Sequence, residues 1–361
     1  MWKIIRVLIV LLLACVGYLL FYPVHMEPKY YELPTAPEYL DNTLETEIIS
    51  GIDKVYLNDT GSAGPDDIVE MLDGTLYTAD IEGNLYKING PQPEVVDTLP
   101  GRPLGLAAGS NGTLYIADAF TGIMQWNGPG TLELILDELD GEKLIYANQI
   151  AVANDGTIYF SHSSSRFDPK TMGGTEPTAV MSYWEQTEDG FVAKIDPDGS
   201  VTKIIEGLVY ANGLALSPNE DFILVTETGR ARIHKVWLSG QKSGEHEIFM
   251  DNLRGYPDNI KSNSKGGYWL VYSSPRLAED KLLPYPFIRK LLWRVQKFIT
   301  VEPTRQSMIV SITENGEEIK SYYDKFGTLG MITTAFSVNS NLYVMTFDSE
   351  WYAIYPVKKD E

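Results

Sequence analysis

The feature that most constrains the fold is a pattern that recurs six times along the chain. Each copy has a turn with Gly or Asn, a short strand of β-branched and aromatic residues, and a second strand after another turn. Asp-Gly and Asn-Gly between apolar runs are strong hairpin signals. A repeat of this kind with unequal loops is typical of propeller blades. The copies begin at Asp73, Asn111, Asp155, Glu220, Gly266 and Asn339.

Six such units predict an all-β fold, a six-bladed β-propeller, because radial repetition of small sheets leaves only short sheet edges exposed. A generic β-sandwich, the alternative all-β fold, does not account for the repetition. The segment 44–57 reads LETEIISGIDKVYL and precedes the first copy. We expect it to supply the strand that closes the ring against the last blade, so that the propeller spans residues 45–361.

One insertion interrupts the repeat at about residues 276–299, and the sequence places it between blades five and six. It contains a helical stretch from about Phe287 with one apolar and one basic side. A lid over the propeller mouth, a helix on a membrane surface and a helix packed on the flank all fit this pattern. The apolar side has Ile288, Leu291, Leu292, Val295 and Ile299, and the basic side has Arg289, Lys290, Arg294 and Lys297.

The N-terminus carries a targeting signal. Residues 7–24 follow Lys3 and Arg6 and contain no charge, and as a helix they would span roughly 27 Å. No small-x-small cleavage site follows, as a removed signal peptide would require. We therefore expect a signal anchor over residues 1–24, a Pro-rich stalk over 25–44 and an extracytoplasmic propeller. Lipoprotein processing at Cys15 is the alternative.

Composition excludes several classes of function. The chain has 29 Lys and Arg against 49 Asp and Glu, a formal charge of −20, which repels nucleic acid but suits cations. Cys15 is the one cysteine, so the propeller can have neither a disulfide nor a cysteine nucleophile. The sequence also contains no G-x-S-x-G elbow, phosphate loop or dinucleotide fingerprint.

Polar residues occupy the same place in four of the six copies. Ten residues before the central strand lie Asp66 in blade one, Asn148 in blade three and Asp258 in blade five, and Asn212 lies eleven before it in blade four. Blades two and six have the apolar Leu104 and Ile332 there. Equivalent positions in propeller blades form a ring around the axis, so we expect these four side chains to converge.

Convergent carboxylates and amides require a cation between them, since their burial is otherwise unfavourable. Oxygen ligands of this kind are those that Ca²⁺ takes, and the ring has no His or Cys for zinc. Asp67 and Asn259, which directly follow two ring residues, are candidate additional ligands or their supports. The alternative is that each residue fills an ordinary turn or strand start.

His162 is the one histidine placed near this ring. It lies in YFSHSSSRF at the end of what the sequence predicts to be the inner strand of blade three. A general base beside a metal site and a hydrogen-bonded structural histidine are both open.

Long stretches of the chain carry a family resemblance. They are GRPLGLAAGSNGTLYIADAFTGI, DGTIYFSHSSSRF, YANGLALSPNEDFILVTETGRARIHKVWL and GYPDNIKSNSKGGYWL. Together with the blades and the ring, the region from about Gly64 to Val357 resembles the strictosidine synthase-like and adipocyte plasma membrane-associated protein-like branch of the six-bladed calcium-dependent phosphotriesterase superfamily. That superfamily includes SMP-30, gluconolactonases and paraoxonases.

The resemblance implies one catalytic Ca²⁺ on the propeller axis. Its ligands would be an acidic residue opening blade one, asparagines in blades three and four, and an aspartate in blade five, which correspond to Asp66, Asn148, Asn212 and Asp258. The chain departs from the family where blade one opens with Asp rather than Glu, where Gln149 replaces an Asp, and where His162 replaces an Asp.

These observations predict a membrane-anchored, Ca²⁺-dependent hydrolase of lactones or aryl esters. Asp258, Asp66 or Asp67 would activate water, and His162 would assist proton transfer. A non-catalytic cell-surface propeller with a structural calcium is the first alternative. A condensing enzyme of the strictosidine synthase type is disfavoured, because Thr333 stands at the position of the glutamate that those enzymes use.

Overall fold

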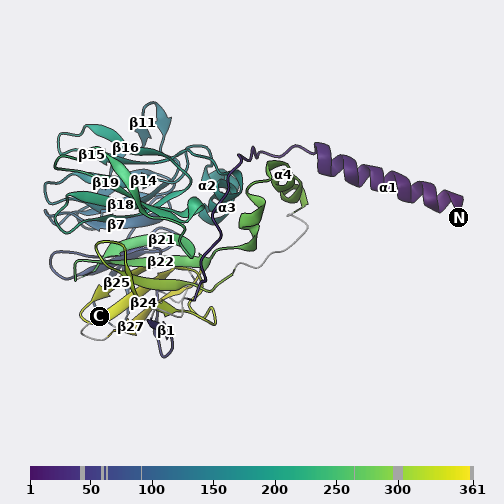
Figure 1. Cartoon of the computed structure of the whole chain (residues 1–361). Helices are drawn as coiled ribbons and strands as arrows, with labels where there is room; N and C mark the ends of the chain where they lie inside the picture. The colour runs from purple at the N-terminus through teal and green to yellow at the C-terminus, as the bar shows by residue number, and fades with distance from the viewer. Residues whose placement is uncertain are drawn as a thin grey trace.

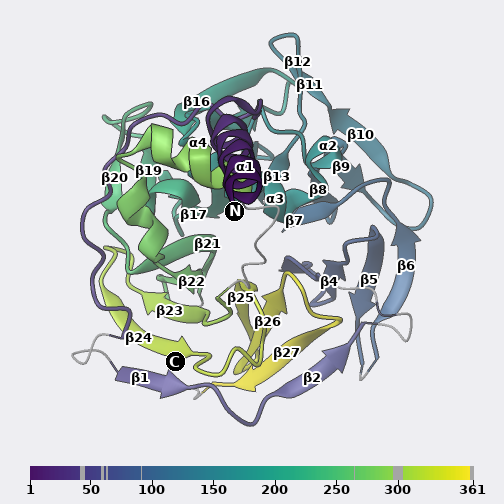
Figure 2. The ribbon, with the colours of Figure 1, turned by 90° about the vertical axis from the view of Figure 1, so that its right-hand side faces the viewer.

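The computed structural model describes residues 1–40, 45–57, 61, 64–90, 92–263, 265–295 and 304–357. Six small sheets surround a central axis like the blades of a propeller (Figure 2). One long helix, α1 (Trp2–Phe21), projects from one face of the ring (Figure 1). The predicted all-β, six-bladed propeller is confirmed.

Each of the first three blades is an antiparallel sheet whose strands follow one another from the axis outwards. Blade one has β3 (Ile68–Glu70), β4 (Leu76–Ala79), β5 (Asn84–Ile88) and β6 (Glu94–Thr98). Blade two has β7 (Pro103–Ala108), β8 (Leu114–Asp118), β9 (Gly122–Trp126) and β10 (Glu133–Leu136). After the hairpin of β11 (Glu138–Leu139) and β12 (Glu142–Lys143), blade three has β13 (Ala147–Val152), β14 (Ile158–His162), β15 (Gly190–Ile195) and β16 (Val201–Leu208).

The other three blades repeat this plan. Blade four has β17 (Ala211–Leu216), β18 (Phe222–Glu227), β19 (Arg232–Trp237) and β20 (His246–Met250), with the short helix η1 (Thr228–Arg230). Blade five has β21 (Gly255–Ser262), β22 (Tyr268–Pro275), β23 (Met308–Ile312) and β24 (Glu318–Tyr323). Blade six has β25 (Ile332–Val338), β26 (Asn341–Thr346) and β27 (Trp351–Pro356).

The chain before blade one closes the ring. As predicted, its strand β2 (Asp53–Tyr56) pairs antiparallel with β27 and becomes the outer strand of blade six, with Lys54 opposite Ala353. A second strand, β1 (Glu45–Ile48), pairs in parallel with β24 and adds a fifth strand to blade five. The N-terminal segment therefore pairs with the outer edges of two blades and protects them.

The core is a circle of apolar clusters, each shared by two neighbouring blades. Leu85 and Leu106 belong to the cluster between blades one and two. Ile68 and Tyr352 belong to the one that joins blade six to blade one. The alternation of the strands places apolar side chains on both faces of each blade, so every blade requires two neighbours, and a closed ring supplies them.

Two helical segments leave the blades, where the sequence predicted one. In blade three, α2 (Pro169–Met172) and α3 (Thr175–Glu185) lie between β14 and β15. The second segment contains η2 (Ala278–Leu282) and α4 (Pro286–Val295), so a helix near Phe287 is confirmed. Its predicted place between blades five and six is wrong: it lies within blade five, because β23 and β24 follow it and complete that sheet. Residues 296–299 of the predicted insertion lie outside the described residues.

The predicted stalk packs along the propeller instead of projecting from it. Its described part, residues 25–40, has no regular structure and is called the strap below. The backbone N–H of Lys29 donates to the carbonyl of Glu185 in α3. Further along, Nη1 of Arg254 in blade five donates to the carbonyl of Tyr39. The strap thus runs from the end of α1 across α3 to the flank of blade five.

Candidate metal centre on the propeller axis

A β-bulge turns the predicted ring residues towards the axis. Between two successive pairs with β14, the chain of β13 advances by three residues, from Ala147 to Ile150, whereas β14 advances by only two. The same one-residue excess occurs between Ala211 and Leu214 in β17 and between Pro257 and Ile260 in β21. Bulges re-aim side chains that would otherwise alternate across the sheet. Asn148, Asn212 and Asp258 lie within these three bulges.

Asn212 and Asp258 lie side by side. Nδ2 of Asn212 donates to Oδ1 of Asp258 over 3.0 Å and to Oγ1 of Thr228 over 3.1 Å. Oδ1 of Asn212 is buried and has no hydrogen-bond partner among the described residues. A buried amide oxygen without a donor is uncommon and requires an explanation, such as a cation or water at that point.

Asp66 opens blade one beside a buried arginine. Its side chain is almost completely buried, and its Oδ1 lies 3.7 Å from Nη2 of Arg102, which is an ion pair but too long for a hydrogen bond. The Arg102 Nη1 donates to the carbonyl of Gly64 over 2.7 Å. Nε and Nη2 of Arg102 have no hydrogen-bond partner among the described residues.

The two ring carboxylates oppose each other's ionisation. Burial raises the pKa of Asp66 to about 7, although the Arg102 charge acts in the opposite direction. Burial also raises the pKa of Asp258 well above its ordinary value, and the negative charge of Asp66 raises it further. A cation between such carboxylates would favour their charged forms. The charge distribution therefore suits a cation at this point of the axis.

Asn148 joins the same region through a neighbouring strand. Its Nδ2 donates to Oγ of Ser163 over 2.9 Å, and that hydroxyl donates to the carbonyl of Ala211, next to Asn212. Asn148 is also buried. The structure therefore brings four predicted ring residues to one end of the inner strands.

Asp67 is engaged by partners outside the ring, whereas Asn259 also reaches Asp66, and its hydrogen bond acts to lower the pKa of that carboxyl. Asp67 accepts the N–H of Ile68 at Oδ1, and at Oδ2 it accepts the N–H of Leu106 and the ammonium of Lys261 at 2.7 Å. Asn259 accepts from Gln149 at Oδ1 over 2.9 Å. Both residues therefore support the ring by linking blades.

Two tyrosines lie next to the ring. The hydroxyl oxygens of Tyr146 and Tyr210 are 2.5 Å apart, and Tyr146 donates to the carbonyl of Thr175 at the start of α3. The charges of Asp258 and Asp66 contribute to raising the pKa of Tyr210, after burial. Tyr210 has a φ of +62°, a strained conformation for a bulky residue that often marks functional positions.

His162 lies apart from the carboxylates. It ends β14, the second strand of blade three, and not the inner strand as predicted. Ser161 and Ser163, on either side of it, hydrogen-bond towards blade four, so the alternation of the strand directs His162 to the other face. There its ring packs 4.7 Å from that of Phe191, measured between centroids.

Arg102, Lys261, Tyr146 and Tyr210 are site residues that the sequence reasoning missed. Arg102 stands two residues before Leu104, the apolar ring position of blade two, and Lys261 stands three residues after Asp258. A basic residue so close to a ring position in an acidic chain was the available signal. Thr333 directly follows Ile332, the apolar ring position of blade six. It donates through Oγ1 to the carbonyl of Asp66 over 2.7 Å.

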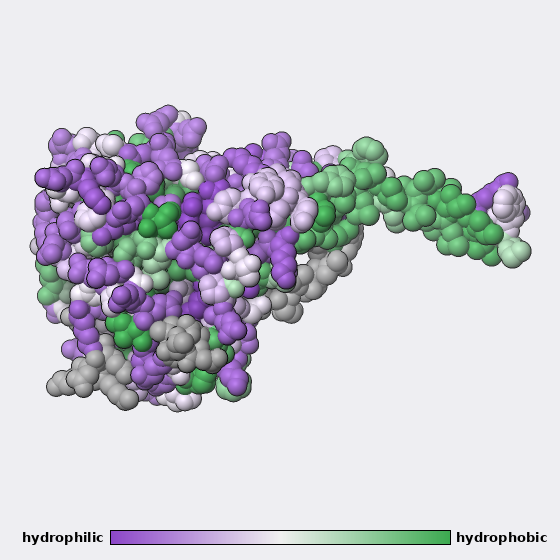
Figure 3. Space-filling model, in the orientation of Figure 1, coloured by the Kyte–Doolittle hydropathy of each residue, from purple (hydrophilic) through white to green (hydrophobic). Residues whose placement is uncertain are grey.

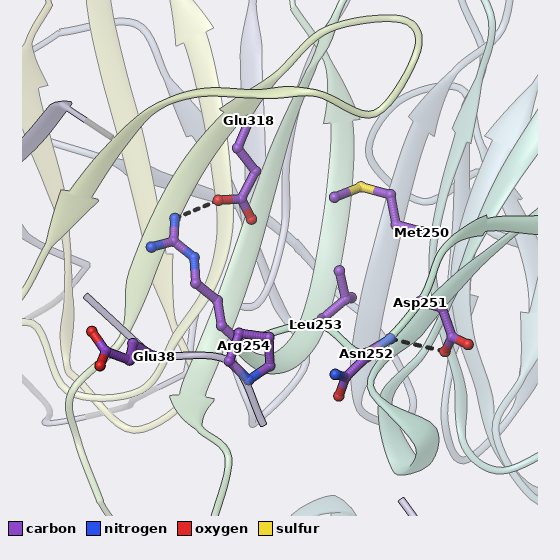
Figure 4. Close-up of a pocket in the computed structure, with 8 residues that line it drawn as sticks. Glu38, Met250, Asp251, Asn252, Leu253, Arg254 and Glu318 are labelled. Carbon is purple, nitrogen blue, oxygen red and sulfur yellow. Dashed lines mark hydrogen bonds and ion pairs between the residues drawn. The ribbon is translucent and has the colours of Figure 1, made fainter. Parts of the chain in front are cut away.

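Two hollows lie away from the ring. One of about 450 Å³ lies between the strap and blades four and five, beside the ion pair of Arg254 with Glu318 (Figure 4). Another of about 370 Å³ lies between His25 and Arg166, near the end of α1. Neither is lined by a ring residue, so they are separate from the axial site.

The axial residues fit a calcium ion by their chemistry. Asp66, Asp258, Asn148 and Asn212 offer hard oxygen atoms, and the unpartnered Oδ1 of Asn212 is already buried among them. Among the described residues, no three His, Cys, Asp or Glu side chains gather as a metal site. The candidate centre therefore depends on its amide oxygens as much as on its carboxylates.

Comparisons with known proteins agree with this architecture. The model of the SMP-30/Gluconolactonase/LRE-like region matches residues 68–276. Adipocyte plasma membrane-associated protein of Salmo salar is 31% identical, covering 97% of this chain and 89% of that protein. Strictosidine synthase-like 4 of Arabidopsis thaliana is 27% identical, covering 86% and 83%.

A solved structure shows the same fold. The calcium-binding protein regucalcin of Agrobacterium tumefaciens superimposes with a TM-score of 0.59 at 16% identity, covering 87% of this chain and 95% of that one. The family model matches more than half of the chain, and a relative that is 31% identical covers 97% of it. The chain therefore belongs to the SMP-30/gluconolactonase/LRE-like family of six-bladed propellers, in the branch of the adipocyte plasma membrane-associated and strictosidine synthase-like proteins.

Proposed function

We propose that this protein is a membrane-anchored hydrolase of lactones or aryl esters that depends on one calcium ion on the propeller axis. The observation that carries the proposal is the cluster of Asp66, Asp258 and Asn212, in which two carboxylates with raised pKa values stand beside a buried amide oxygen without a partner. The gluconolactonase-type family and the calcium-binding neighbour support it.

Asp66, Asn148, Asn212 and Asp258 would hold the ion. A bound calcium ion would act as a Lewis acid on the carbonyl oxygen of the substrate. Asp258 would accept a proton from the attacking water, and Asn212 Nδ2 keeps its carboxylate in place through their 3.0 Å hydrogen bond. The Tyr146 and Tyr210 pair would exclude further water from above the ring.

The Arg102 guanidinium would assist the same reaction through its own charge and donors, independently of the metal. Two of its nitrogens have no hydrogen-bond partner among the described residues, and its charge is fixed beside Asp66. Donors already in position, in a site shielded from water, favour negative charge that develops on an oxygen during ester hydrolysis. Asp67 and His162 have no part in this scheme, because Lys261 engages the first and the second faces Phe191.

A second candidate is a non-catalytic propeller with a structural calcium. The burial of the ring favours it, since Asp66 is 5%, Asn148 3% and Asn212 4% exposed. Under this candidate the ion would stabilise the fold, and no ester or lactone would be hydrolysed.

The test uses the full chain in detergent, with calcium content measured by elemental analysis and hydrolysis of a lactone and aryl-ester panel measured before and after chelation. The variants are Asp258→Asn and Asn212→Ala, and the matched control is Asp251→Asn, at an exposed position. We expect about one calcium per chain and turnover that chelation abolishes, with both lost in the two variants and kept in the control. Calcium without turnover would support the structural candidate, and undiminished turnover in both variants would refute the site.

The proposed location follows from α1. It is the one helix among the described residues that is long and apolar enough to cross a membrane, and the relatives are plasma membrane-associated proteins by name. With Lys3 and Arg6 before α1, we place the N-terminus in the cytoplasm and the propeller outside. Protease protection of the propeller in sealed, right-side-out vesicles would contradict this orientation.

A further inference from the structure

The helical segments stand on the same face of the propeller as the axial site. In β13 the first residue, Ala147, pairs with His162 at the end of β14, and in β21 Gly255 pairs with Pro275 at the end of β22. The segments with α2 and α3 and with η2 and α4 continue from these strand ends. They therefore leave the blades beside the bulges that hold the ring residues. We call this side the mouth face.

Helix α1 leaves from the mouth face as well. Figure 1 shows α1 and α4 on the side of α2 and α3, and Figure 2, viewed along the axis, places α1 in front of the ring. The hydroxyl of Tyr18 in α1 donates to the carbonyl of Arg294 in α4 over 3.0 Å. Nε of Arg294 donates back to the carbonyl of Tyr22 over 2.7 Å. Helix α4 is therefore fixed at the propeller-proximal end of α1.

The outer side of α4 is apolar and exposed. Phe287 is 61% exposed, Ile288 40% and Leu292 37%, and their spacing places them on one side of the helix. The opposite side packs onto the protein, where Arg289 donates to the carbonyl of Trp184 and the ring of Trp293 packs near that of Trp184 at a tilt of 53°. In the space-filling view, the apolar surface of α1 continues onto this region (Figure 3).

We propose that α4 lies on the bilayer that α1 crosses, with Phe287, Ile288 and Leu292 inserted at the level of the lipid headgroups, so that the mouth face of the propeller is turned towards the membrane. Three observations favour lipid as the occupant. The apolar side of α4 is continuous with that of α1, the two helices are joined by hydrogen bonds, and Tyr18 and Tyr22 lie at the junction, as aromatic residues do at membrane interfaces.

The arrangement gives the axial site a short path to the membrane. A molecule that reaches the ring from the mouth face enters on the side of the propeller where α3 and α4 lie, next to the lipid surface. Amphiphilic molecules that partition into the bilayer would therefore be concentrated at the entrance. The docking of α4 itself requires α1 in the membrane, which is part of the proposed function, but it does not require the protein to be an enzyme.

The test measures membrane depth in the full chain reconstituted into phosphatidylcholine vesicles. Single cysteines carry an environment-sensitive fluorophore, and a fraction of the lipid carries a quencher, placed close to the headgroup for the α4 positions and on the acyl chain for Cys15. In a Cys15→Ser background, the test positions are Phe287→Cys and Leu292→Cys. The matched control is Leu72→Cys, which is 72% exposed in the hairpin between β3 and β4, at the other end of the blades. Label on the native Cys15 reports on α1.

We expect lipid quenchers to remove about half of the fluorescence at positions 287 and 292 and almost none at position 72. Thermal unfolding like that of the unlabelled chain would show that the exposed substitutions leave the fold intact. Quenching at Cys15 with none at 287 or 292 would overturn the proposal while leaving the anchor in place. Energy transfer between labels at position 287 on different chains, without lipid quenching, would also overturn it in favour of a second copy.

If neither Cys15 nor the α4 positions are quenched, the membrane anchor and the docking of α4 both fail. Quenching at 287 and 292 without quenching at Cys15 would refute the span by α1, and with it the proposed docking of α4 on the bilayer that α1 crosses. None of these outcomes depends on hydrolysis, so they are separate from the test of catalysis.

Discussion

The ammonium of Lys261, on the inner strand of blade five, lies 2.7 Å from Oδ2 of Asp67 at the opening of blade one. Blades one and five are not neighbours, so this ion pair joins them through the interior of the ring. Both side chains are largely removed from solvent. Breaking a buried pair from one side is costly because it leaves an uncompensated charge.

We therefore expect Lys261→Met to lower the free energy of unfolding by about 3 kcal/mol, because Asp67 would lose its counter-charge. Chemical denaturation of the full chain in detergent measures the loss. Lys265→Met, at an exposed position of the same blade, should change it by less than about 0.5 kcal/mol. Adding Asp67→Asn to Lys261→Met should restore part of the loss. A loss below about 1 kcal/mol would show that the pair contributes little.

The pH dependence of stability should identify His162 as a buried neutral residue. Burial lowers the pKa of His162 to about 3, against about 6.5 in an unfolded chain. Between these values the unfolded state binds the additional proton, so stability falls as the pH drops from about 6.5 towards 3. In His162→Leu the fall in this window should be shallower, by about 1 kcal/mol per pH unit.

The control for His162 is His246→Leu, at an exposed position, which should leave the slope unchanged. Denaturant unfolding at a series of pH values measures both variants. An unchanged slope in His162→Leu would mean that His162 is protonated in the folded protein. If the protein hydrolyses esters, His162→Leu should keep most of the turnover, because the side chain faces Phe191 and not the ring.

The sequence predicted the blades and the ring because both follow from local rules. Hairpin turns mark the blades, and a constant offset from the central strand marks Asn148 and Asp258. The offset works because the bulge falls at the same place in β13, β17 and β21. Asp67 was predicted to be catalytic. Its position next to Asp66 in the sequence could not reveal that its carboxylate pairs with the ammonium of Lys261, 194 residues away.

Long-range packing accounts for the other differences. The strap was expected to be a free stalk because its sequence is Pro-rich, yet its backbone groups bond to α3 and blade five. Helix α3 was not predicted, because its sequence has no strong apolar periodicity. The insertion with α4 was assigned to the wrong place because it separates the first two strands of blade five from β23 and β24, although Asn315-Gly316 marks a hairpin between these two.

Arg102 should weaken calcium binding by its charge while supporting the fold. Its guanidinium lies 3.7 Å from Asp66, so in Arg102→Gln a bound cation would lose a repulsive neighbour. We expect calcium to bind about tenfold more tightly in calorimetric titrations of the full chain. Arg232→Gln, on the third strand of blade four and paired with Glu227 instead of a ring carboxylate, should leave the affinity unchanged. Weaker binding in Arg102→Gln would show that Arg102 organises the site instead of opposing the ion.

Arg289 should control whether the strap and α4 stay in place. Its guanidinium donates to the carbonyls of Trp184 in α3, Lys29 in the strap and Leu283 after η2. Arg289→Leu would remove the donor from these three carbonyls, at a cost of about 1–3 kcal/mol for the buried carbonyl of Leu283 and less for the two that are partly buried. We expect faster hydrogen exchange in the strap and in α3, with the amides of β14 and β18 unchanged, because local opening does not require the blades to separate. Lys290→Leu, on the same helix, is the matched control and should leave the exchange in the strap as it is. If exchange in Arg289→Leu rises equally throughout the propeller, the strap is part of the global folding unit and does not open separately.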